Sequence, residues 1–189
     1  GADRPSGMVL DSEDNVYVTG YTFSPDFPTT TGAYDGTLNQ DEIYNDVFVI
    51  KMSSDGSELL YSTFVSGSYR DRGVAIVLDS GNNAYVAVET TSDDFPTTTG
   101  PSHSGDYDIF VLKLNSDGSD LLYSTYVGGS DYDNSVDLVL DDGNNAYVAG
   151  ATVSDDFPTT VGAFDEIGDE DFQNCVLFKL SSDGSDLLY

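Results

Sequence analysis

Two loops of the sequence concentrate acidic side chains, and carboxylates at this density suit a hard cation. The first loop reads YDGTLNQDEIYND and the second reads FDEIGDEDFQN. Ca²⁺ takes six to eight oxygen ligands, and such loops supply several of them. These loops are therefore candidate Ca²⁺ sites, whereas the favoured interpretation is a solvated acidic rim; a surface that binds a partner is a further alternative. The candidate ligands are Asp35, Asp41, Glu42, Asp46, Asp165, Glu166, Asp169 and Asp171.

Residues typical of catalytic sites are scarce. His103 is the only histidine, and no Ser or Cys nucleophile pattern accompanies it, so we expect an exposed loop histidine. Cys175 aligns with Val47 and Ile109 of the repeats described below, which predicts a small core residue. With 34 acidic residues, close carboxylate pairs arise by chance and do not indicate glycoside cleavage. We predict that the protein is not an enzyme.

The net charge narrows the classes of partner. Six Lys and Arg against 34 Asp and Glu give −28. Such a surface repels phosphate backbones and anionic lipid, so we expect no nucleic-acid partner. No run of 18 apolar residues occurs, which predicts no membrane insertion. The aromatic content, 13 Tyr and 10 Phe, favours a folded chain over a disordered one.

A phenylalanine-proline motif occurs three times, as SPDFPTTTG, SDDFPTTTG and SDDFPTTVG. Proline ends strand pairing, so the chain must leave a sheet at this point. We expect the preceding Phe to fill the gap between neighbouring structural units and the Thr hydroxyls to bind turn amides. The alternative is a Thr-lined binding patch. The residues of this structural motif are Phe27, Pro28, Phe95, Pro96, Phe157 and Pro158.

The motif belongs to a longer unit that is written three times along the chain. VLDSGNNAYVA, DIFVLKLNSDGS and LLYSTYVGGS from the middle unit have counterparts in the other two. The middle unit predicts strands at 74–79, 83–90, 108–115 and 121–128, because β-branched and aromatic residues dominate these runs and turn residues separate them. Four antiparallel strands in a tandem repeat are typical of propeller blades. We divide the single repeat domain, 1–189, into blades at 1–66, 67–128 and 129–189, the last with a truncated fourth strand.

These motifs resemble the SBBP beta-propeller repeat family over the whole chain. The resemblance implies an all-β fold of three tandem four-stranded antiparallel blades, found in cell-surface and secreted proteins, and it brings no catalytic residues. Three blades do not close a ring. The expectation is thus a partial propeller, or half of a six-bladed ring if two copies associate.

One acid departs from the repeat. Asp137 stands where the other units have Gly7 and Ala75. Burying an unpaired carboxylate is costly, so we expect it to face an axial water channel, with a cation or a subunit contact as alternatives.

Three functional hypotheses follow. The first is an extracellular or cell-surface structural or adhesive scaffold, stabilised by Ca²⁺ and assembling through open strand edges with other blades of the same chain or with copies of itself. The second is a module that binds a glycan or a protein through aromatic residues near the variable loops. These residues are Tyr34, Tyr44, Tyr107, Phe164 and Phe172. The third is a polysaccharide-cleaving enzyme, which requires converging carboxylates.

Overall fold

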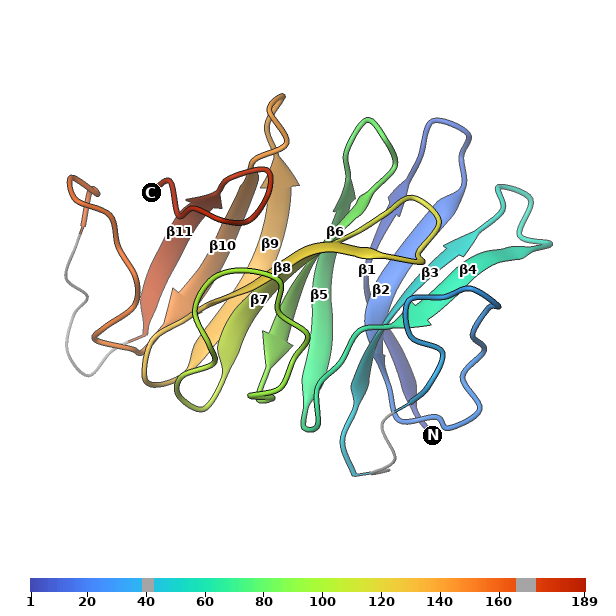
Figure 1. The fold of residues 1–189 in the computed structure, drawn as a ribbon, viewed down its shortest axis with the longest axis horizontal. Helices are drawn as coiled ribbons and strands as arrows, with labels where there is room; N and C mark the ends of the chain where they lie inside the picture. Colours follow the sequence, from blue (N-terminus) through green and yellow to red (C-terminus); the bar gives the residue numbers. More distant parts are fainter. Residues whose placement is uncertain (39–42, 166–172) are drawn as a thin grey trace.

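The structure is a computed structural model that describes residues 1–38, 43–165 and 173–189. All of its regular elements are strands (Figure 1). The first group is β1 Asp3–Leu10, β2 Val16–Thr22, β3 Asp46–Met52 and β4 Leu59–Phe64. The second is β5 Asp71–Leu78, β6 Ala84–Thr90, β7 Asp108–Leu114 and β8 Leu121–Val127. The third is β9 Asp133–Leu140, β10 Ala146–Thr152 and β11 Asn174–Leu180. Among the described residues, no helix is long and apolar enough to cross a membrane.

Each group forms one antiparallel sheet whose strands pair in chain order. We call these the first, second and third sheets. The four strands predicted in the middle unit are confirmed within a few residues at each end. Along β11 of the third sheet, residues 187–189 pair with the strand through an isolated bridge between Leu187 and Leu180 and through hydrogen bonds of Lys179 with Leu188 and Tyr189.

The hairpin between the first two strands of each sheet depends on one residue with a positive φ angle. These residues are Asp14, Asn82 and Asn144, at 62°, 60° and 61°. Asn and Asp tolerate this left-handed conformation better than other non-glycine residues. The turn residues that separate the predicted strands therefore include the one residue on which each tight hairpin depends.

The three sheets pack face to face in a row, from β1–β4 at one end to β9–β11 at the other (Figure 1). Alternate residues of β7 point to opposite neighbours. Phe110 and Leu112 join the apolar cluster shared with the first sheet, whereas Ile109 and Val111 join the one shared with the third. This alternation is the period of two that a strand buried on both faces requires.

The two end sheets each have one face that contacts no other sheet within the described part of the chain. We call the side of the first sheet that points away from the second the front face; it carries Met8, Leu10, Val18 and Ile50. Met8 is 67% exposed, while Ile76, at the same repeat position in the second sheet, is 5% exposed. The corresponding side of the third sheet is the back face. It carries Asp137, Val139, Tyr147, Ala149, Cys175 and Leu177.

Candidate functional site

Every sheet contains the same ion pair, which joins the hairpin Asp after its first strand to a Lys of its third strand. The pairs are Asp11 with Lys51 at 3.2 Å, Asp79 with Lys113 at 3.1 Å, and Asp141 with Lys179 at 2.9 Å. In each sheet the Lys also lies over a tyrosine ring, with the ammonium 4.6–4.8 Å from the ring centre. The sequence shows that these Asp and Lys residues recur in each unit, but it does not show that they form an ion pair.

The hairpin carboxylates form hydrogen bonds and an ion pair within the protein. Asp11 accepts hydrogen bonds from the backbone amides of Glu13 and Asn15 and from the Asn15 side chain. Burial opposes its ionisation, but the hydrogen bonds from Asn15 and Lys51 outweigh burial and lower the pKa of Asp11 to about 2. The lysine ammonium thus neutralises the carboxylate that a bound cation would otherwise neutralise.

The phenylalanine-proline motif packs onto its own sheet and binds that sheet's outer edge. Phe95 is 2% exposed, its ring centre lies 4.3 Å from that of Phe110, and it belongs to the cluster between the first two sheets. Thr98 and Ser124 of β8 bind each other through backbone and hydroxyl groups. Thr30 and Ser62 of β4 repeat this arrangement. The threonines therefore bind an edge strand, where the sequence predicted turn amides, and they shield that edge from other strands.

Phe27 and Phe157 are only half-buried. Phe27 stacks on Phe48 at 4.7 Å on the front face, which has no neighbouring sheet. Phe157 lies 6.1 Å from Phe178, in a sheet whose fourth strand is reduced to a bridge. The burial of the motif therefore depends on a neighbouring sheet for Phe27 and on the fourth strand of its own sheet for Phe157.

The predicted Ca²⁺ ligands fall into two groups. Asp41, Glu42, Glu166, Asp169 and Asp171 lie outside the described residues. Of the others, Asp35 accepts a hydrogen bond from the Thr37 amide, Asp46 is buried at the start of β3, and Asp165 is exposed. No group of three or more His, Cys, Asp or Glu side chains suited to a metal occurs within the described ranges.

Three expectations about single residues were wrong. Asp137 lies on the back face, paired in register with Ala149, and does not line an axial channel. Cys175 is exposed on the same face because no sheet covers it there. His103 is half-buried and lies edge-on to the Tyr126 ring at 5.7 Å, and burial lowers its pKa. In each case neighbouring packing, which the local sequence does not contain, determined the environment.

Buried carboxylates occur at the junction between the second and third sheets. Asp108 and Asp133 are 1% and 0% exposed. A Cβ atom built on Gly128 would lie 2.2 Å from Asp108 Oδ1 and 2.9 Å from Asp133 Oδ2, so the two carboxylates flank this glycine. Burial, with Asp133 nearby, raises the pKa of Asp108 to about 7.

The residue of the preceding repeat that is equivalent to Asp133, namely Asp71, is also buried. Asp71 is 0% exposed and accepts hydrogen bonds from the Gly67 amide and the Thr90 and Ser92 hydroxyls. Burial nevertheless raises its pKa to about 7. Sequence reasoning missed these acids, although the recurrence of Asp at the first residue of β5 and β9 was a usable signal.

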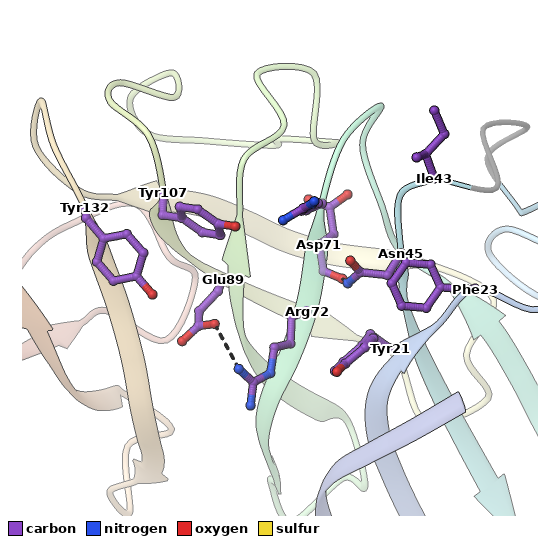
Figure 2. Close-up of a pocket in the computed structure, with 10 residues that line it drawn as sticks. Tyr21, Phe23, Ile43, Asn45, Asp71, Arg72, Glu89, Tyr107 and Tyr132 are labelled. Atoms are coloured by element: carbon purple, nitrogen blue, oxygen red, sulfur yellow. Dashed lines mark hydrogen bonds and ion pairs between the residues drawn. The ribbon is translucent and has the colours of Figure 1, made fainter. Parts of the chain in front are cut away.

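A pocket of about 470 Å³ lies where all three sheets meet (Figure 2). Tyr107 and Tyr132 line one side of it, with ring centres 4.9 Å apart. Figure 2 shows Tyr21, Phe23 and Asn45 on the opposite side. Between the two sides, Arg72 pairs with Glu89 at 3.5 Å. Ile43, Arg70 and Asp71 complete the lining.

Three antiparallel sheets with identical hairpins, packed face to face, define the chain as an all-β tandem of propeller-type blades. The family model for SBBP, a beta-propeller repeat, matches residues 1–28 and 122–158 and confirms the resemblance there. The curated proteins contain no match to the chain.

Proposed function

We propose that the chain is a non-catalytic scaffold outside the cell or on its surface, in which propeller blades assemble with further blades. These are other blades of the same polypeptide or of a second copy. One observation carries the proposal: the front and back faces expose apolar residues at positions that are buried wherever two sheets meet. Leu177, for example, is 60% exposed, whereas Val111 at the same repeat position is 0% exposed.

The packing within the chain supports this proposal. Each internal junction encloses an apolar cluster of buried side chains, and burial of apolar area is the main favourable term in such contacts. The outer strand β4 is shielded by Thr30, whereas the described residues pair with β11 only near its C-terminal end, through the Leu187 bridge and the hydrogen bonds of Lys179 with Leu188 and Tyr189. Assembly therefore involves the sheet faces first, with strand addition at β11 as a further contact.

Light scattering across protein concentrations tests the scaffold proposal. We expect the particle mass to rise between about 10 and 200 µM, and Leu177→Glu to abolish this rise because it places a charge in the new interface. Val161→Glu is the matched control, since Val161 is exposed on a loop outside both faces. A monomer at every concentration, or equal effects of both variants, would contradict the proposal.

Adding the chelator EDTA in the same light-scattering measurement tests whether Ca²⁺ stabilises the scaffold. If Ca²⁺ stabilises the scaffold, EDTA lowers both the particle mass and the melting temperature, and added CaCl₂ restores them. If the acidic loops are a solvated rim, EDTA changes neither quantity at constant ionic strength.

Binding of a glycan or protein is the second candidate function. The observation that favours it is the gathering of aromatic pairs near the loops, Tyr107 with Tyr132 and Tyr44 with Tyr69 at 5.4 Å. Of the other aromatic residues predicted for this role, Tyr34 packs against the first cluster, Phe164 is fully exposed, and Phe172 lies outside the described residues. Aromatic side chains with one open side are common in binding surfaces.

A further inference from the structure

The pocket where the three sheets meet is lined by residues that differ between the repeats. Three pairs of equivalent repeat positions contribute to it: Arg70 and Tyr132, Tyr21 and Glu89, and Asn45 and Tyr107. In contrast, the residues that hold each sheet together, such as the hairpin Asp and its Lys, are the same in all three units. The packing that keeps the repeat uniform therefore does not dictate the residues of the pocket.

The pocket also contains two of the six basic residues in the chain. The three lysines are each committed to a hairpin Asp, which leaves only Arg4, Arg70 and Arg72. In a chain with a net charge of −28, unconstrained surface positions are expected to be acidic. The pocket thus holds two arginines beside two carboxylates, Asp71 and Glu89, and only Arg72 of the two arginines is paired with one of them.

Both guanidinium groups are accessible to a ligand. The Arg72 side chain is 52% exposed, and it is oriented by Glu89 at 3.5 Å and by the Tyr21 ring, whose centre lies 5.9 Å from the guanidinium carbon. Arg70 is exposed and forms no ion pair with any residue that the structure describes. Guanidinium groups bind carboxylates through two parallel hydrogen bonds, which makes a carboxylate the natural ligand group.

The rest of the lining suits a ring. Tyr107 and Tyr132 on one side, and Tyr21 and Phe23 on the other, flank the charged centre (Figure 2). Aromatic faces pack against the apolar C–H faces of rigid rings with little loss of entropy. A volume of about 470 Å³ lies in the ordinary range for small-ligand sites and has room for one or two pyranose rings. An acidic peptide would satisfy the arginines but would leave the aromatic walls without a matching ring.

We propose that this pocket binds a glycan that contains uronic acid. Arg70 and Arg72 hold the carboxylate, and the aromatic residues on both sides contact the sugar rings. The proposal rests on the second candidate function and specifies its ligand class and its site.

Calorimetric titration with digalacturonic acid tests the proposal, in 0.15 M and 0.5 M NaCl so that repulsion from the acidic surface is screened. Neutral galactobiose is the comparison ligand. We expect digalacturonic acid to bind at least about tenfold more tightly than galactobiose, and Arg70→Gln to weaken this binding by about tenfold or more. Arg4→Gln is the matched control, because Arg4 is exposed and lies outside the pocket. Tyr107→Ala is expected to weaken the binding of both sugars.

Each contrary result has a separate meaning. Equal binding of the two sugars, lost in Tyr107→Ala, overturns the acidic ligand class but retains a glycan-binding function. Tighter binding of a tetraglutamate peptide than of digalacturonic acid also overturns the proposal and points to a protein partner. No binding of any probe at about 10 mM contradicts both the proposal and the second candidate function. An equal loss in Arg4→Gln and Arg70→Gln overturns the assignment of the site.

Discussion

Asp108 shows how burial can change the pKa of a residue that two repeats share, and thereby the stability of the fold. It occupies the first position of β7, as Asp46 does in β3, and is 1% exposed at a junction that also buries Asp133. Its Oδ2 accepts a hydrogen bond from the Ser104 amide, whereas its Oδ1 has no hydrogen-bond partner among the residues that the structure describes. A carboxylate in this environment is more stable protonated than ionised, which is why its pKa is raised to about 7.

The pH dependence of stability follows from the sign of this shift. The pKa of Asp108 is higher in the folded state than the ordinary value near 4. Between about pH 4 and pH 7 the folded state therefore binds a proton that the unfolded state has lost. The free energy of unfolding consequently falls as the pH rises through this range. Asp71 contributes in the same direction. Below about pH 4 the hairpin acids act oppositely, because the pKa of Asp11 is lowered to about 2 and protonating it removes stability.

Asp108→Asn should raise the melting temperature at pH 8 by about 3 °C or more, because a neutral amide replaces a buried charge. Near pH 5 the variant and the parent should melt within about 1 °C of each other, since Asp108 is then protonated. Calorimetry at both pH values measures the difference, and Asp142→Asn at an exposed position is the control. A variant that is less stable than the parent at pH 8 would show that Asp108 is stabilised as a carboxylate.

The packing of the sheets explains why a small residue occupies one position in the first strand of the first and second sheets. Gly7 pairs in register with Thr19, Ala75 with Ala87, and Asp137 with Ala149, so these three are equivalent. A Cβ atom on Gly7 would lie 3.2 Å from the Ala75 Cα, which leaves no room for a longer side chain. In the first two sheets, the next sheet therefore packs directly against this position. Asp137 blocks the same packing on the back face.

Ala75→Asp and Asp137→Ala should have opposite consequences. Ala75 is 9% exposed, so an Asp there buries a charge between sheets and should cost on the order of 3 kcal/mol of unfolding free energy. Asp137→Ala should leave this free energy within about 0.5 kcal/mol of the parent while strengthening self-association, because it makes the back face resemble an internal junction. Urea unfolding and sedimentation measure the two effects. An unchanged association constant in Asp137→Ala would show that the back face is not an assembly surface.

The whole molecule carries a net charge of −28 with few basic residues to offset it. The three lysines neutralise one carboxylate in each sheet, which leaves most of the acids at the surface and in the loops. Mutual repulsion among these acids favours expanded states, and salt screens it over about 10 Å at 0.1 M and about 3 Å at 1 M.

The melting temperature should therefore rise by about 5 °C or more between 0.05 and 1 M NaCl, because screening relieves the repulsion in the folded state. A parallel series with CaCl₂ at equal ionic strength separates screening from specific binding. A larger gain in CaCl₂ would support Ca²⁺ sites in the acidic loops. A melting temperature that does not change with salt would mean that repulsion is not a significant term in the stability of this fold.

The sequence alone determined the local structure: the three repeats, the strands of each sheet and the hairpins at Asp14, Asn82 and Asn144. These features depend on residues a few positions apart, through alternation along a strand and the positive φ angle of a tight turn. For the same reason the sequence predicted the structural positions of the Phe-Pro motif but not which copy of it is buried.

Only the tertiary structure decided what each repeated residue does. Val111 is buried and Leu177 is exposed at the same repeat position, because the second sheet has neighbours on both sides and the third has one. The same cause exposes Cys175, places Asp137 on an open face, buries Asp108 and brings Arg70 and Tyr107 of the second repeat together with Tyr132 of the third in one pocket. Burial and charge environment are sums over spatial neighbours, and repeats of identical sequence differ in those neighbours.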